Sequence, residues 1–142
     1  MFAKLAPFFI AFCCLATPLT AQEQISSLPD SIAYCSVLSQ KTGTASFYAL
    51  KFNGRRTSNG EKLDNTKYTC AHPKLPFDTY VRVTNLKNGK AVVVRVTDRF
   101  KQKGDHLIDL TRVAAKDIDM IRQGRARVLV EVLDSAQFVA RP

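Results

Sequence analysis

Short strand-forming segments separated by turn residues run through the chain from residue 41 onward, and they limit it to a small β fold. Residues 80–86 alternate polar and apolar side chains, and residues 91–96 (AVVVRV) follow after Asn88-Gly89. An Asn-Gly pair between two such segments predicts a hairpin with a type I′ turn. Three further strands are predicted at residues 42–48, 106–110 and 126–133.

One helix interrupts this series of strands. It is predicted to begin with Thr111 as its N-cap, to run to about Met120, and to end before Gly124. The apolar residues of one helix face are Ala114, Ile118 and Ile121. Several short strands with turns between them and a single short helix indicate a mainly β fold, a small closed barrel.

The N-terminus has the layout of a secretory signal. Residues 1–4 carry one lysine, residues 5–16 (LAPFFIAFCCLA) are apolar, and residues 17–21 end in small side chains. The alternative, a buried N-terminal helix, fits this layout less well. Cys13 and Cys14 do not follow a lipoprotein box, so we expect cleavage and export to the periplasm or outer envelope, without a lipid anchor.

The 142 residues suit one folded domain. We expect residues 1–21 to be the signal peptide and 22–40 to be an arm or linker. The barrel is then expected at 41–134, followed by a C-terminal tail at 135–142. No second apolar stretch follows the signal, so no stable membrane span is expected. The protein is also expected to be a monomer.

The chain is basic, with a net charge of +9, which becomes +8 when the one lysine of residues 1–21 is removed. In the cytoplasm such a charge would suggest nucleic acid. For an exported protein, nucleic acid is not expected, and the anionic partners are peptidoglycan carboxylates, teichoic acids or lipid head groups. A merely solvated basic surface explains any single lysine or arginine equally well.

Two cysteines remain after the signal, Cys35 and Cys70. An oxidising envelope permits a disulfide between them, which would join the N-terminal arm to the segment before His72. Pairing and two free thiols both remain open, because the sequence does not show how closely the two Cα atoms approach.

The candidate chemistry comes from polar residues in unexpected places. Asp98 ends an apolar run, and Asp109 lies between Ile108 and Leu110. Such a carboxylate is either hydrogen-bonded structurally or tuned for proton transfer. Glu61 and His72 lie in loop-like stretches. The histidines and cysteines are too scattered for a zinc pattern, and no phosphate loop or nucleophilic serine elbow is present, so no metal and no cofactor are expected.

Nine short segments together resemble the RlpA (rare lipoprotein A) family, relatives of expansins and of MltA-type lytic transglycosylases. They are GTASFY (43–48), FNG (52–54), TSNGE (57–61), TCAH (69–72), LPF (75–77), VRVTNL (81–86), NG (88–89), VVVRVTDR (92–99) and IDLT (108–111). The family usually has Trp at Phe47, and Gly-Pro where this chain has Phe100-Lys101. The resemblance implies a six-stranded double-psi β-barrel.

The same resemblance implies an endolytic lytic transglycosylase. Such an enzyme needs no cofactor and cleaves the β-1,4 bond between N-acetylmuramic acid and N-acetylglucosamine, leaving a 1,6-anhydro end. The family's catalytic residues match Glu61, His72 and Asp98, and the MltA relatives add Asp109. By this analogy Asp98 or Asp109 is the acid/base, and Glu61 and His72 orient groups or shuttle protons. The expected glycan-binding residues are Tyr48, Asn59 and Arg99.

Two other functions remain open. One is a non-catalytic, expansin-like module that binds peptidoglycan through the same groove. The other is a structural or partner-binding envelope protein. If the four candidate catalytic residues, Asp98, Asp109, Glu61 and His72, do not converge on one cleft, the enzyme hypothesis is weakened.

Overall fold

The computed structural model describes residues 36–134, which form one closed barrel with a short helix. Its elements in chain order are β1 (Val37–Phe47), η1 (Leu50–Phe52), β2 (Thr69–Ala71), β3 (Tyr80–Asn85), β4 (Ala91–Asp98), β5 (His106–Leu110), α1 (Arg112–Asp117) and β6 (Ala126–Leu133). The expected signal peptide, the expected C-terminal tail and Cys35 lie outside the described residues.

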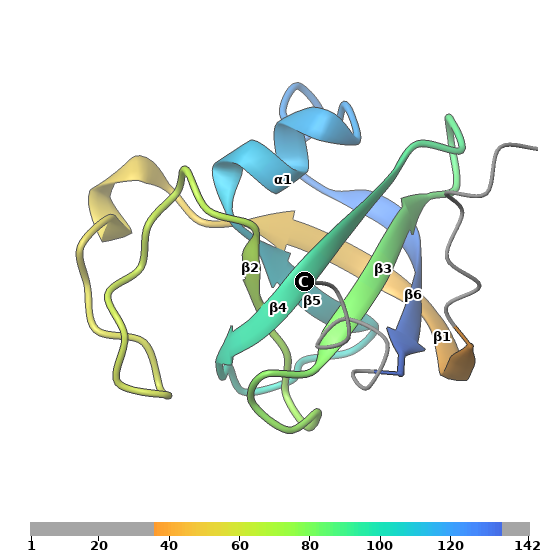
Figure 1. Ribbon diagram of the computed structural model, residues 1–142. Helices are drawn as coiled ribbons and strands as arrows, with labels where there is room; N and C mark the ends of the chain where they lie inside the picture. Colours follow the sequence, from red (N-terminus) through yellow and green to blue (C-terminus); the bar gives the residue numbers. More distant parts are fainter. Residues whose placement is uncertain (1–35, 135–142) are drawn as a thin grey trace, which may run out of the picture. The chain divides into compact units, whose positions relative to one another are not determined.

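The six strands follow the order β1-β5-β2-β4-β3-β6 around the barrel. β1 pairs with β5 and β2 with β4 in parallel, whereas the other neighbours are antiparallel. Figure 1 shows β3 and β4 crossing the near side, with the long loop between η1 and β2 extending away from the strands. The predicted six-stranded, mainly β barrel with one short helix is confirmed.

Alternating side chains fill the barrel interior. On β3, Val81 and Val83 are fully buried, and Val94 and Val96 of β4 lie beside them in the same core. This period of two explains why those strands were predictable. Gly43 permits the close contact of β1 with β5, because a Cβ atom built there would lie 2.8 Å from a carbonyl oxygen of that region.

β1 begins at Val37, inside the stretch that we expected to be an arm. Residues 37–42 are exposed, so no buried face produces a periodic signal in the sequence. The backbone ladder with β6, which runs from Val37 to Ala45, supports this part of the strand instead. The arm boundary at residue 40 is therefore corrected to before Val37.

The hairpin between β3 and β4 is confirmed, but its predicted turn type is wrong. A type I′ turn needs positive φ at both central residues. Gly89 has a φ of 72°, whereas the non-glycine residues with positive φ in the described part are Asp78 and Asp119. The turn is longer than two residues, since the Gly89 N–H donates to the Asn85 carbonyl.

The helix is shorter than predicted. α1 ends at Asp117, and Asp119 has a left-handed φ of 54° that does not continue an α-helix. Thr111 is the N-cap, but its hydroxyl donates to the Lys67 carbonyl at 2.6 Å instead of capping the helix. Among the described residues, no helix is long and apolar enough to cross a membrane.

Candidate active site

A half-open cavity of about 540 Å³ lies where the ends of β1 and β4 meet β5 and the long loop. Its walls carry two carboxylates, three guanidinium groups and several aromatic rings. The lining residues are Ser46, Phe47, Tyr48, Ala49, Phe52, Arg55, Arg56, Thr57, Ser58, Leu63, Asp98, Arg99, His106 and Asp109. We call this cavity the cleft.

Asp98 ends β4 and is surrounded by hydrogen-bond donors. Its Oδ1 accepts from the backbone N–H and the hydroxyl of Ser58, at 2.9 and 2.6 Å, and from the backbone N–H of Arg99 at 2.8 Å. Its Oδ2 accepts from the Tyr48 hydroxyl at 2.8 Å. Both carboxylate oxygens are therefore occupied by the protein itself.

These donors determine the charge of Asp98. Partial burial alone would raise the pKa of Asp98, but the hydrogen bonds from Ser58, Arg99 and Tyr48 outweigh burial and lower that pKa below its ordinary value. Burial and the hydrogen bond to Asp98 raise the pKa of Tyr48, with a smaller contribution from Asp109. The pair consists of a neutral tyrosine and an ionised carboxylate at neutral pH.

Asp109 lies on β5 and has a different environment. Its Oδ1 accepts a short hydrogen bond from the Ser46 hydroxyl and lies 2.8 Å from Nε2 of His106. Its Oδ2 has no hydrogen-bond partner within residues 36–134. The Asp109 side chain is 19% exposed, and the residue lines the cleft. Asp109 thus has one oxygen that a bound ligand can reach.

Arg99 also lines the cleft, on the side nearest the β2–β3 connection. Its guanidinium lies 4.1 Å from the centre of the Phe77 ring and donates to the His72 carbonyl at 3.1 Å. Arg55 and Arg56 line the cleft as well, and none of the three forms an ion pair with a carboxylate of the described residues. The cleft therefore offers cationic groups to an anionic ligand.

Asn59 does not line the cleft and acts within the long loop. Its Oδ1 accepts from the Thr57 hydroxyl at 2.7 Å and from the Glu61 N–H at 3.1 Å, and its own N–H donates to the Thr97 carbonyl. These contacts attach the loop to the end of β4, close to Ser58 and its bonds to Asp98.

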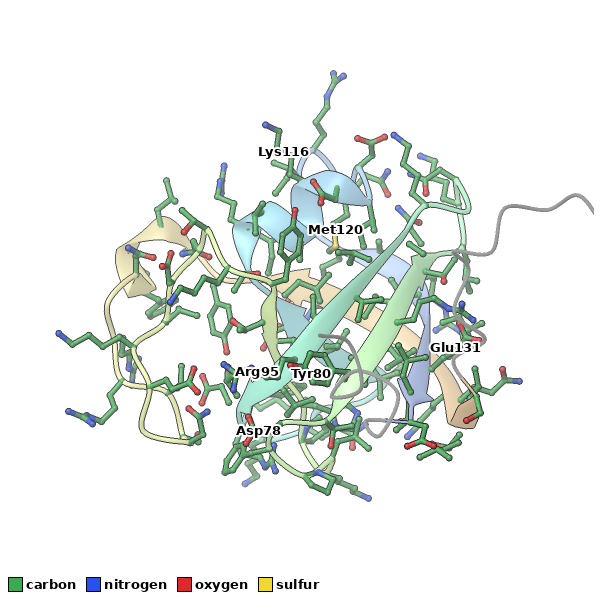
Figure 2. All side chains as sticks on the ribbon, in the orientation of Figure 1. Asp78, Tyr80, Arg95, Lys116, Met120 and Glu131 are labelled. Carbon is green, nitrogen blue, oxygen red and sulfur yellow. The ribbon has the colours of Figure 1, made fainter. Side chains whose placement is uncertain are left out.

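Glu61 lies outside the cleft, beside a second cavity of about 370 Å³. Both of its oxygens accept from the Arg95 guanidinium, at 3.0 and 2.9 Å. The hydrogen bond with Arg95 is the main reason why the pKa of Glu61 is lowered. Arg95 also donates to Asp78 at 2.5 Å, and Figure 2 shows these two labelled side chains close together. Glu61 therefore connects the long loop to β4 as a carboxylate.

His72 is buried and does not line the cleft. Its Nδ1 accepts from the N–H groups of Lys74 and Leu75, at 3.2 and 3.0 Å. Burial, followed by the positive charges of Arg99 and Lys41, lowers the pKa of His72 to about 4. The neutral imidazole of His72 thus holds the turn that follows β2. The backbone carbonyl of the same residue accepts a hydrogen bond from Arg99.

The structure brings Asp98, Asp109, Tyr48 and Arg99 together, and leaves Glu61, His72 and Asn59 in the supporting loops. Sequence reasoning missed Ser46, Ser58 and His106. Ser46 and Ser58 lie inside the segments that resemble the RlpA family, so the resemblance could have identified them as site residues. No such signal existed for His106, because strict alternation along a strand would put His106 and Asp109, three positions apart, on opposite faces.

A β-bulge explains the position of His106. Thr44 and Ala45 of β1 are consecutive, yet they pair with His106 and Ile108 of β5. The extra residue, Leu107, turns the strand, so His106 and Asp109 reach the same cleft. The described residues contain no group of three or more His, Cys, Asp or Glu side chains placed to hold a metal ion.

Cys70 is fully buried in the barrel core. Burial raises the pKa of its thiol, which disfavours the reactive thiolate. Its candidate partner, Cys35, lies outside the described residues, so the disulfide stays a prediction.

Comparisons with known proteins agree with this architecture. The family described as "Lytic transglycolase" matches residues 40–130. A relative from Pseudomonas aeruginosa, named endolytic peptidoglycan transglycosylase RlpA, is 50% identical over 99 residues, which are 70% of this chain and 29% of the relative. A relative of the same name from Neisseria meningitidis is 46% identical over 97 residues, covering 68% and 41% respectively. The match thus spans less than half of either relative.

Two solved structures share the fold. The Streptomyces papain inhibitor superposes with a TM-score of 0.56 at 18% identity, covering 70% of this chain and 99% of its own. An expansin from Clavibacter michiganensis in its apo form gives 0.54 at 19% identity, covering 68% and 51%. At such identities the likeness concerns the barrel alone.

Proposed function

Because this chain belongs to the lytic transglycolase family through its RlpA-like double-psi β-barrel, we propose that it is an endolytic peptidoglycan transglycosylase. It cleaves the β-1,4 bond between N-acetylmuramic acid and N-acetylglucosamine and leaves a 1,6-anhydro end. The names of the relatives support the reaction, and the two carboxylates of the cleft support the mechanism.

Asp109 is the general acid in this proposal. The observation that carries the assignment is the difference between the two carboxylates: both oxygens of Asp98 accept hydrogen bonds, whereas Oδ2 of Asp109 has no partner in the described residues. A proton donor needs an oxygen that can reach the glycosidic oxygen. A proton held on Oδ2 of Asp109 meets that requirement.

Asp98 acts as a fixed negative charge. Its lowered pKa keeps it ionised, which makes it a poor proton donor near neutral pH. An ionised carboxylate beside the anomeric carbon stabilises the positive charge that develops as the glycosidic bond breaks. Tyr48 and Ser58 hold this carboxylate in place, so it does not have to reorganise during the reaction.

The atoms balance with one acid/base residue. Asp109 donates its proton to the glycosidic oxygen, and the bond from that oxygen to the anomeric carbon breaks. The 6-hydroxyl oxygen of the muramoyl residue then bonds to the anomeric carbon, and its proton passes to Asp109. Asp109 ends the cycle protonated, no water is consumed, and no metal or cofactor takes part.

The supporting residues then have positioning roles. Glu61 ties the loop that carries Ser58 to Arg95 of β4, and Asn59 fastens the same loop. His72 shapes the turn against which Arg99 rests. Arg99 lines the cleft, as do Arg55 and Arg56, and the three guanidinium groups supply positive charge to a bound glycan.

A peptidoglycan substrate places the protein in the cell envelope, which agrees with the expected signal peptide at residues 1–21 and with export to the periplasm or outer envelope. The proposed organisation is then a signal peptide, a short arm, the barrel and a C-terminal tail. We further propose that the barrel acts as a monomer.

Mass spectrometry of muropeptides tests the activity directly. Purified protein is incubated with isolated glycan strands, both peptide-bearing and denuded, and the products are searched for 1,6-anhydro ends. New internal anhydro ends support the proposal, and their absence from both substrates contradicts it. Co-sedimentation with insoluble peptidoglycan without new ends would identify a glycan-binding module instead.

A further inference from the structure

His106 is in direct contact with the proposed acid. Its Nε2 lies 2.8 Å from Oδ1 of Asp109 and 3.2 Å from the Ser46 hydroxyl oxygen. Ser46 in turn donates to the same Oδ1. The three side chains form a connected cluster on the wall of the cleft, and 17% of the His106 side chain is exposed.

The ring of Phe100 packs against the face of the His106 ring. The two rings stack with centroids 4.6 Å apart and an angle of 30° between their planes. The ring of His106 is therefore restrained twice, by stacking on Phe100 and by the contacts of Nε2. The nearest acid in sequence, Asp105, is directed elsewhere, because its Oδ2 accepts from Thr44 and Arg127.

Two hydrogen bonds to one oxygen have a chemical consequence for the acid. When the Asp109 carboxyl group is protonated, the oxygen that accepts the Ser46 hydroxyl and, in the tautomer with a proton on Nε2, the imidazole N–H is its carbonyl oxygen. The acidic proton then belongs on Oδ2, the oxygen without a partner in the described residues. The cluster thus selects which oxygen of Asp109 carries the proton and fixes where that proton points.

We propose that His106, restrained by Phe100, is a positioning residue for Asp109. Its Nε2–H group donates a hydrogen bond to Oδ1 of Asp109, which leaves Oδ2 facing the glycosidic oxygen. This inference rests on the proposed function, but its structural part, the Nε2–H to Asp109 contact, exists with or without turnover. His106 does not exchange a proton with the substrate in this scheme.

A variant series at His106 separates positioning from folding. His106→Leu removes the donor and is expected to lower kcat for anhydro-end formation by about tenfold or more, with KM changed little. His106→Gln can place an amide N–H near the position of Nε2 and is expected to recover most of that loss. Thermal melts of both variants check that the barrel is intact.

Phe100 supplies a second, independent series. Phe100→Leu removes the ring and is expected to lower kcat in the same direction as His106→Leu, whereas Phe100→Tyr keeps a ring to stack on and is expected to lose less. Equal kcat values for wild type, His106→Leu and Phe100→Leu would overturn the inference while leaving the transglycosylase proposal intact.

Nitrogen NMR of the imidazole tests the contact without any activity. In alkaline buffer, long-range ¹H–¹⁵N spectra are expected to show the proton of the His106 ring on Nε2. Asp109→Asn is expected to shift or split that signature. A ring protonated on Nδ1 in the wild type, or a spectrum unchanged by Asp109→Asn, overturns the inference. An inactive wild type with the Nε2 signature would instead count against the proposed function alone.

Discussion

The Tyr48 hydroxyl donates a hydrogen bond of 2.8 Å to Oδ2 of Asp98, joining the end of β1 to the end of β4 across the cleft. Because 50 positions separate them, the sequence does not show that the two side chains meet. Together they hold an ionised carboxylate at the centre of the proposed site, and this pair is the first target for mutation.

Tyr48→Phe removes one donor from Asp98 and keeps the ring. We expect the pKa of Asp98 to rise toward its ordinary value, kcat to fall by about tenfold, and the free energy of unfolding to fall by about 1 kcal/mol. Carboxyl-carbon NMR titration and muropeptide kinetics measure the two effects. An unchanged Asp98 titration would show that Ser58 and Arg99 suffice to keep the carboxylate ionised.

Asp109→Asn and Asp98→Asn are expected to fail in different ways. Without a proton on Oδ2, Asp109→Asn is expected to lose about 100-fold or more in kcat and to keep glycan binding. Asp98→Asn removes the stabilising charge, so kcat is expected to fall and the low-pH limb of the pH–rate profile, which the ionisation of Asp98 sets in this scheme, is expected to disappear. If the acid residue were Asp98, this variant would lose the high-pH limb instead.

Glu61→Gln probes the long loop rather than the chemistry. It weakens the pair with Arg95 and is expected to cost less in kcat than Asp109→Asn, because Glu61 does not line the cleft. Lys62→Gln, on the same loop and without an ion pair in the described residues, is the matched control. A loss at Glu61 as large as that at Asp109 would place Glu61 in the reaction itself.

The lowered pKa of His72 predicts that the folded protein becomes less stable as the pH falls. Its pKa is about 4 in the folded protein against an ordinary value of 6.5, so the unfolded chain binds the proton more tightly. The stabilising contribution is complete above pH 6.5 and is lost as the pH falls toward 4, by on the order of 2 kcal/mol.

His72→Asn is the test of this pH dependence. Asparagine can accept the same two backbone N–H groups through its Oδ1 but does not titrate. We expect urea unfolding of this variant to show a smaller decrease in stability between pH 6.5 and pH 4 than the wild type. Identical pH dependence in the two proteins would assign the acid sensitivity to other groups.

Local pattern was enough for much of the barrel. The alternation in β3 and β4 and the apolar segments of β5 and β6 mark half-buried strands, and the N-cap Thr111 marks the helix start. Exposed backbone pairing leaves no such pattern, which is why the first residues of β1 were read as an arm. The length of α1 depended on the left-handed conformation of Asp119, which sequence does not reveal.

The sequence by itself determined a small mainly β barrel, an expected exported protein, and a family resemblance that named Asp98 and Asp109. Only the tertiary structure decided which candidates share a cleft, because convergence depends on strand register and not on spacing. The bulge at Leu107 turns His106 toward Asp109, while the ion pair with Arg95 keeps Glu61 outside the cleft. Hydrogen-bond donors brought from distant segments, above all Tyr48 and Ser58, then give the two carboxylates their different environments.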